Sequence, residues 1–220
     1  MPEPQELLLV RHGQSTANAR GIWQGQMEFP LSESGRRQAT LAGRALAREP
    51  FDGLYSSPLS RAFETAEIIR RESGFSGAVV PVEGLSERNG GILEGHTWAE
   101  QEEINPELAK KFLSIPEEER WALVEAETDE QVMERFGLAL SSIRAGHPEG
   151  SRLVIVSHGG VMRAFLRDLF GPETLPGTQR ASNASITRIS WPEENPPRLL
   201  ELASTEHLFE DGGPRASVVE

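Results

Sequence analysis

Two short, continuous apolar runs, LLLV at 7–10 and LVIV at 153–156, constrain the fold of this chain more than any other feature. Each run is too short and too uniformly apolar for an amphipathic helix, and this pattern is typical of a buried strand in a parallel sheet. Each run also leads into a polar turn that contains a histidine and a glycine, RHG at 11–13 and SHGG at 157–160. The sequence therefore predicts two buried strands that each present a histidine at a strand-to-helix turn.

Helix-like segments alternate with the strand-like segments along the chain. Capping residues and periodicity predict helices at 32–48, 57–74, 128–145 and 161–171, with Ser57 as the N-cap of the second helix. Further strands are expected at 53–55 and 78–85, and a closing antiparallel pair at 184–191 and 198–205. This alternation favours an α/β fold, a three-layer α/β/α sandwich with a mainly parallel central sheet.

No internal repeat and no long linker divides the chain, so we expect one domain over residues 1–210 and a disordered tail at 211–220. Residues 96–128 contain many Glu and Pro and show no clear periodicity of apolar residues, so we expect short helices that form an insertion over the functional site, which is described below. Trp98 and Trp121 in this segment could line a substrate lid, although core packing is the commoner role of tryptophan. Lys110 and Lys111 fit a solvated helix face better than an anion site.

The charge balance and the absence of cysteine exclude several function classes. The chain has 22 Lys and Arg against 34 Asp and Glu, a net charge of −12, and its field repels nucleic acid and acidic membranes. Without cysteine there is no disulfide, thiolate zinc site or cysteine nucleophile. The first residues lack a basic signal segment and the apolar runs are too short to span a membrane, so we expect a cytoplasmic protein.

The two predicted strand ends suggest a ligand site. In open α/β sheets ligands bind outside the carboxyl ends of the strands, so His12 and His158 can meet there although 146 residues separate them. Arg61 is expected in the first turn of the second helix, and Arg11 precedes His12. Two guanidinium groups near helix N-termini and two imidazoles would together bind a phosphate group.

Glu87, in the stretch LSERNGGILEG at 85–95, is the candidate acid. Beside a bound phosphate the pKa of a carboxylate should rise, which suits a general acid, while a solvated loop glutamate is the simpler interpretation. A metal site is the competing idea for a glutamate among histidines. We disfavour it because the histidines lack a close pairing and the arginines would oppose a dication.

Four ordered blocks resemble a known family. RHGQSTAN with QGQMEFPLSESG, SSPLSRAFETA, LSERNGGILEG and VSHGG are similar to the signatures of the histidine phosphatase superfamily, in its phosphoglycerate mutase-like branch, and cover about residues 7–165. The resemblance implies that His12 is a phosphorylated nucleophile and that Glu87 donates a proton to the leaving oxygen. It also implies that His158, Arg11 and Arg61 hold the phosphoryl oxygens, with Asn18, Gln24 and Gly159 as lesser substrate contacts, and that neither cofactor nor metal is needed.

The resemblance leaves the reaction open between a phosphatase, a phosphoglycerate mutase and a non-catalytic phospho-ligand binding module. The mutases have a longer insertion with additional basic residues after the glutamate block. Here 35 residues separate Gly95 from Glu130, and residues 96–108 contain no Lys or Arg, which favours a metal-independent phosphatase of a small phosphorylated metabolite. Every expected catalytic position is filled, which disfavours the binding module. Homodimers are the commonest soluble oligomers, so a homodimer is the general expectation for an oligomeric state.

Overall fold

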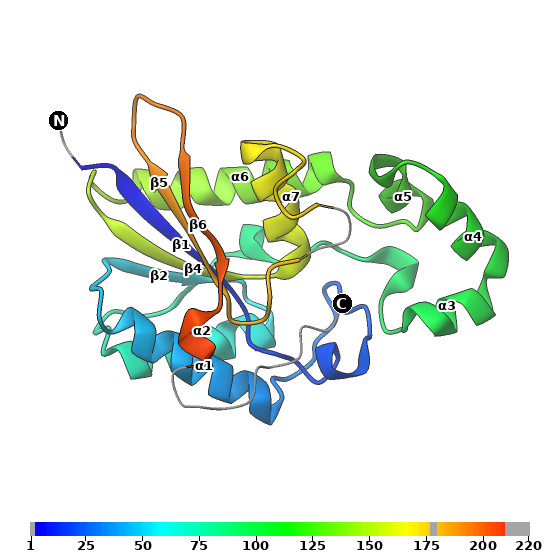
Figure 1. Ribbon diagram of the computed structural model, residues 1–220, viewed down its shortest axis with the longest axis horizontal. Coiled ribbons are helices and arrows are strands. Elements are labelled where there is room, and N and C mark those ends of the chain that lie inside the picture. Colours follow the sequence, from blue (N-terminus) through cyan, green and yellow to red (C-terminus); the bar gives the residue numbers. More distant parts are fainter. Residues whose placement is uncertain (1–2, 177–179, 210–220) are drawn as a thin grey trace.

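A six-stranded sheet forms the centre of the computed structural model, which describes residues 3–176 and 180–209 (Figure 1). The strand order is β3-β2-β4-β1-β5-β6, with β1 at Gln5–Arg11, β2 at Gly53–Ser56, β3 at Val80–Pro81, β4 at Arg152–Ser157, β5 at Ile186–Trp191 and β6 at Arg198–Ser204. β1, β2, β3 and β4 pair in parallel, while β5 is antiparallel to both β1 and β6. The expected mainly parallel sheet with a closing antiparallel pair is confirmed.

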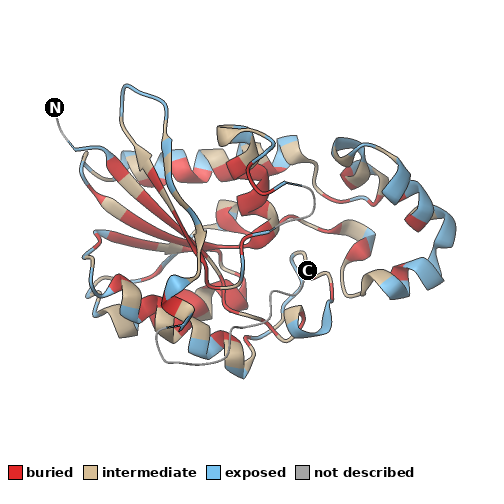
Figure 2. Cartoon of the chain, viewed as in Figure 1, coloured by how far each residue is buried: buried red, intermediate tan, exposed pale blue. Residues whose placement is uncertain are grey.

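Four longer helices cover the two faces of this sheet. α1 (Glu33–Leu46) and α2 (Ser60–Ser73) lie on one face, and α6 (Asp129–Ala145) and α7 (Gly159–Phe170) lie on the other (Figure 1). Successive side chains of β1 point to opposite faces, so Leu8 and Val10 pack with α1 and α2, while Leu7 and Leu9 pack with α6 and α7. Figure 2 shows the buried residues concentrated in these central strands. The three-layer arrangement is therefore confirmed.

Residues 96–128 contain three short helices, α3 (Trp98–Ile104), α4 (Pro106–Ser114) and α5 (Glu117–Leu123), which extend beyond the end of the sheet (Figure 1). They enclose a small core of their own, in which Phe112 and Trp121 are buried and Trp98 and Trp23 are partly buried. Trp98 and Trp121 therefore have the core role that the sequence favoured. Closure of this insertion over the site stays a prediction.

Two local predictions were wrong. α2 begins at Ser60 and has Leu59 as its N-cap, without a side-chain hydrogen bond, so Ser57 is not the cap. The strand predicted over 78–85 is reduced to Val80–Pro81 at the sheet edge and is followed by the 3-10 helix η2 (Glu83–Leu85). Pro81 lacks a backbone N–H, which limits strand pairing there. By contrast, the capping box at Thr128 opens α6 as predicted.

Three further 3-10 helices complete the described elements: η1 (Asn18–Arg20), η3 (Gly91–Leu93) and η4 (Glu206–Phe209). None of the helices in the described part of the chain is long and apolar enough to cross a bilayer. The tail predicted at 211–220 lies outside the described residues.

Candidate active site

The two histidines come together at the carboxyl ends of neighbouring strands. β1 and β4 are paired in parallel with Arg11 opposite Ser157, so the next residue in each strand, His12 and His158, lies at the same edge. Their ring centroids are 5.0 Å apart, and the two residues are 2% and 0% exposed. The meeting predicted from sequence is confirmed.

Hydrogen bonding fixes the protonation pattern of His12. Its Nδ1 lies 2.6 Å from the carbonyl oxygen of Gly13, and because a carbonyl only accepts, Nδ1 carries the proton and Nε2 keeps a lone pair. A side chain at Gly13 would place a Cβ 2.4 Å from the Gly35 oxygen, so the turn requires glycine. Burial, followed by the charges of His158, Arg61 and Arg11, holds the pKa of His12 well below its usual value. His12 is therefore neutral at neutral pH, as a nucleophile must be.

Both predicted arginines are held by backbone carbonyls and keep a free donor. Arg11 donates from Nη1 to the Ala181 oxygen at 2.6 Å, and Arg61, 1% exposed, donates to the oxygens of Met27 and Gly25 at 2.8 and 2.6 Å. The Nε of each arginine is buried and has no hydrogen-bond partner among the described residues. Burial, then the charge of Arg180, lowers the pKa of Arg11 to about 10, so it remains a cation at neutral pH.

His158 makes a contact that sequence analysis missed. The Nε2 of His158 lies 2.8 Å from Ser57 Oγ, and this hydroxyl oxygen accepts a hydrogen bond from the Leu59 N–H at 3.2 Å. The buried Nδ1 of His158 has no partner among the described residues. If Ser57 donates its proton to Nε2, Nδ1 carries a hydrogen that can be donated to a phosphoryl oxygen. Burial, then the charges of Arg61, Arg11 and Arg135, holds the pKa of His158 well below its usual value.

Glu87 lies against the N-terminus of α7. Its Oε2 accepts from the Gly160 N–H at 2.9 Å, and its Oε1 accepts from the N–H groups of Val161 and Arg88, each at 2.8 Å. Burial acts to raise the pKa of Glu87, but the N–H of Gly160, the charge of Arg180, the N–H of Arg88 and the charge of Arg61 together outweigh it, so the pKa is lowered. The helix end stabilises the carboxylate, and the rise in the pKa of Glu87 expected beside a bound phosphate stays a prediction.

Two glycines after His158 allow these close approaches. A Cβ on Gly159 would lie 3.1 Å from the Arg11 guanidinium carbon, and a Cβ on Gly160 would lie 2.6 Å from Glu87 Oε1. Gly159 thus makes room for the Arg11 guanidinium, whereas direct substrate contact by Gly159 stays a prediction. The sequence signal for Gly160 was the doubled glycine itself.

The two predicted amide contacts are tied into the loop after His12. The Oδ1 of Asn18 accepts hydrogen bonds from the backbone and hydroxyl of Ser15 and from Asn183 Nδ2, and Gln24 Oε1 accepts from the Ser15 hydroxyl at 2.6 Å. Asn183 also donates to the His12 carbonyl at 3.1 Å, which connects this loop to the residue beside the site. Substrate contacts of Asn18 and Gln24 stay predictions.

These groups define a site for phosphoryl chemistry. One imidazole nitrogen of His12 has an available lone pair, and buried nitrogen atoms of Arg11, Arg61 and His158 have no hydrogen-bond partner among the described residues. A doubly charged anion would satisfy all of these donors. No cluster of three or more metal-ligating side chains occurs among the described residues. The site is thus suited to binding a phosphoryl group.

The chain belongs to the histidine phosphatase superfamily (branch 1), whose model matches residues 7–205. It is 39% identical over 164 residues to the metal-independent phosphoserine phosphatase of Arabidopsis thaliana, covering 74% of this chain and 68% of that protein. A solved structure of a mutant Entamoeba histolytica phosphoserine phosphatase in complex with phosphoserine is 28% identical, with a TM-score of 0.76 and coverage of 93% and 99%.

A phosphoglycerate mutase structure from Bacillus anthracis, 24% identical, has a TM-score of 0.82 over 96% of this chain and 98% of that one, which shows the shared fold. Relatives with phosphatase names, together with the family match, identify this chain as a phosphatase of the histidine phosphatase superfamily. The family and fold predicted from the four sequence blocks are confirmed.

Proposed function

We propose that this protein hydrolyses small phosphomonoesters without a metal, through a phosphohistidine formed at His12. The observation that carries the proposal is the fixed tautomer of His12, which leaves Nε2 free to attack near buried nitrogen atoms of Arg11, Arg61 and His158 that have no partner in the described part of the chain. Phosphoryl transfer needs mainly positioning and charge stabilisation, and these donors supply both. A cytoplasmic location is part of the proposal, because a chain without cysteine fits a reducing compartment.

In the first step the Nε2 lone pair of His12 attacks phosphorus, and the bond from phosphorus to the leaving oxygen breaks. The leaving oxygen takes that electron pair and a proton from Glu87. The lowered pKa of Glu87 means that its carboxyl must first gain a proton. A bound phosphate dianion favours this gain, since a like charge raises the pKa of a carboxylate, so we expect substrate binding to take up a proton.

In the second step water replaces the leaving alcohol. Glu87, now a carboxylate, accepts a proton from the water as its oxygen attacks phosphorus, and the bond between Nε2 and phosphorus breaks. His12 returns to its neutral form with the proton still on Nδ1, held by the Gly13 carbonyl. Inorganic phosphate leaves and the enzyme is restored.

The substrate in this proposal carries a second negative group on its leaving side. Arg180 is exposed and lies over the Trp23 ring at 5.1 Å, and it has no carboxylate partner among the described residues. Its charge acts on both Arg11 and Glu87, which places it near the reacting groups. Phosphoserine, named for the Arabidopsis and Entamoeba relatives, has such a group in its carboxylate.

The proposal is tested by assaying the purified protein in EDTA with p-nitrophenyl phosphate, phosphoserine, sugar phosphates and phosphoglycerates. We expect phosphate release without interconversion of phosphoglycerates. Interconversion with little phosphate release would establish a mutase instead, and binding without turnover of any phosphomonoester would establish the binding module. The oligomeric state, for which a homodimer is the general expectation, is tested separately by light scattering.

The covalent step has its own test with a matched control. Brief incubation with a radiolabelled substrate, followed by denaturation, should trap an acid-labile, alkali-stable phosphoprotein. His12→Ala should abolish both the label and turnover. His147→Ala should retain both the label and turnover. His147 precedes β4, whereas His158 follows it, and the His147 ring is hydrogen-bonded to Tyr55 at 2.7 Å. Turnover by His12→Ala at the normal rate would overturn the nucleophile assignment.

A further inference from the structure

The loop that carries Glu87 is held by side chains. Four consecutive backbone carbonyls, those of residues 84–87, accept hydrogen bonds from side-chain donors outside the loop. Ser157 donates to Leu85 at 2.8 Å, and Gln26 donates to Glu87 at 3.0 Å. The remaining donors all belong to one residue of α6, Arg135. A segment without regular pairing needs such partners for its buried polar groups.

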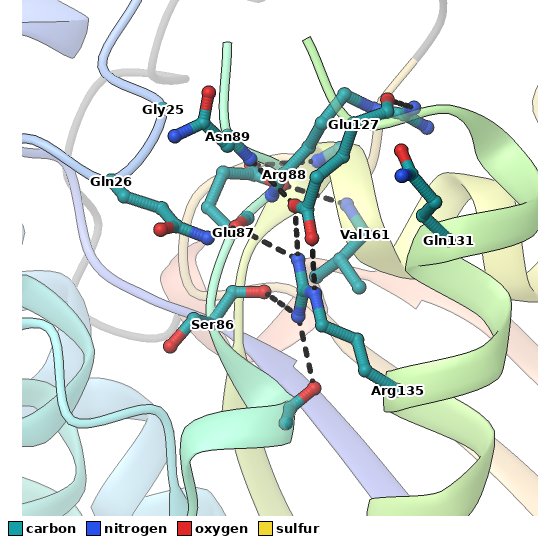
Figure 3. A network of polar contacts seen from close by, with 12 residues as sticks. Gly25, Gln26, Ser86, Glu87, Arg88, Asn89, Glu127, Gln131, Arg135 and Val161 are labelled. Carbon is teal, nitrogen blue, oxygen red and sulfur yellow. Dashed lines mark hydrogen bonds and ion pairs between the residues drawn. The ribbon is translucent and has the colours of Figure 1, made fainter. Parts of the chain in front are cut away.

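Arg135 uses its whole guanidinium group for this purpose. Nη1 donates to the carbonyl oxygens of Gly84 at 3.1 Å and Ser86 at 2.8 Å, and Nη2 donates to that of Glu87 at 2.9 Å (Figure 3). Nε and Nη2 each donate to one carboxylate oxygen of Glu127 at 2.8 Å. All five N–H donors of the guanidinium are therefore used, in the planar fork that lysine cannot reproduce.

Glu127 connects this arrangement to the end of the 96–128 insertion. Its Oε2 also accepts from the Asn89 N–H at 2.7 Å, and its backbone oxygen accepts from the Arg88 guanidinium. Arg88 in turn lies over the Trp121 ring, 4.3 Å from its centroid, in the small core of the insertion. The loop on both sides of Glu87 is thus fixed to α6 and to the insertion.

We propose that Arg135 is a positioning residue for the general acid: its guanidinium, paired with Glu127, holds the 84–87 loop so that the Glu87 carboxyl meets the leaving oxygen. This inference rests on the proposed role of Glu87 as general acid. Arg135 bonds the backbone of the loop, and the carboxyl oxygens of Glu87 bond Gly160, Val161 and Arg88 instead. Its effect on proton donation therefore acts through geometry.

The test compares two substrates of similar size that differ in how much they need an acid. Nitrophenolate leaves readily without a proton, whereas the benzyl alcohol oxygen of benzyl phosphate leaves only when protonated. The value of kcat/KM reports the phosphoryl transfer to His12, the step in which the leaving group departs. Loss of acid catalysis should therefore lower kcat/KM for benzyl phosphate far more than for p-nitrophenyl phosphate.

Arg135→Gln should lower kcat/KM for benzyl phosphate by about 10- to 100-fold, part of the 10²- to 10⁴-fold typical of general acid catalysis, and change that for p-nitrophenyl phosphate by less than about threefold. Arg188→Gln is the matched control, because Arg188 has a similar side-chain exposure, 21% against 23%, and pairs with Glu49 and Glu201 at a distance from the loop. It should leave the ratio of the two substrates unchanged. Arg135→Lys, which keeps the charge without the fork, should give a loss between wild type and Arg135→Gln.

Glu87→Gln separates the possible failures. If it loses benzyl phosphate activity selectively while a folded Arg135→Gln or Arg135→Lys does not, the positioning role is overturned and the general acid stands. If Glu87→Gln itself shows no selective loss, the acid assignment fails. If Arg135→Gln does not fold, Arg135→Lys provides the test. An equal fall in kcat/KM for both substrates in that variant would show that Arg135 has a purely structural role.

Discussion

Gly160→Ala tests whether the helix end positions Glu87. A Cβ at residue 160 would lie 2.6 Å from Glu87 Oε1, and ordinary van der Waals contact begins at 3.4 Å, so the carboxylate must retreat by roughly 0.8 Å. The obstructing atoms are the far end of a flexible side chain, so the backbone can remain in place. The retreat stretches the hydrogen bonds from Gly160 and Val161, now 2.9 and 2.8 Å, beyond the range of a hydrogen bond.

The cost of this displacement can be estimated. Hydrogen bonds to a charged group contribute about 1.5–3 kcal/mol each, and a 1 Å misplacement of a reacting group can cost about 10²-fold in rate. We expect kcat/KM for benzyl phosphate to fall by about 10²-fold, with a much smaller fall for p-nitrophenyl phosphate. Alanine favours the helix by about 0.5–1 kcal/mol over glycine, which offsets only a small part of the loss of two such hydrogen bonds, so we expect the stability to fall as well.

Steady-state kinetics and thermal unfolding measure the two effects separately. Gly137→Ala is the control, since Gly137 lies within α6 and a Cβ there would meet nothing within 4 Å. It should keep full activity and gain about 0.5–1 kcal/mol of stability. Benzyl phosphate activity of Gly160→Ala within threefold of wild type, in a folded protein, would refute the geometric reasoning.

Three further predictions follow from the site. Burial lowers the pKa of His158 well below 6.5, so below about pH 6.5 the unfolded chain binds a proton that the folded chain does not. The free energy of unfolding therefore decreases as the pH falls. His158→Asn should therefore show a smaller drop in Tm between about pH 7.5 and pH 5 than wild type, and an equal drop would contradict this. Ser57→Ala should lower kcat by about 10-fold or more with little change in KM, because His158 loses the hydrogen-bond partner of its Nε2. A change in KM alone would argue against an effect of Ser57 on the tautomer of His158. Arg180→Ala should raise KM for phosphoserine by about 10-fold and leave KM for p-nitrophenyl phosphate unchanged, whereas equal effects on both would remove Arg180 from substrate selection.

Much of the site could be predicted because its main residues lie in locally readable patterns. The apolar runs of β1 and β4 end two residues before His12 and His158, and adjacent parallel strands bring their carboxyl ends to one edge. Arg61 was placed correctly in the first turn of α2 although its capping residue was not. A residue can be predicted to lie in the first turn of a helix even when the predicted helix start is wrong by a few residues, whereas a predicted capping contact needs the correct start.

The sequence by itself determined the alternation of strands and helices, the histidines at the strand ends and the family signatures, because these depend on periodicity and on turn chemistry between near neighbours. Only the tertiary structure decided how those groups are tuned. The lowered pKa of Glu87 comes mainly from the N–H of Gly160, 73 residues away, and from the charge of Arg180, and the loop that carries Glu87 is held by Arg135, 48 residues away. Such contacts follow from packing in three dimensions, where burial and helix orientation set the strength of each charge.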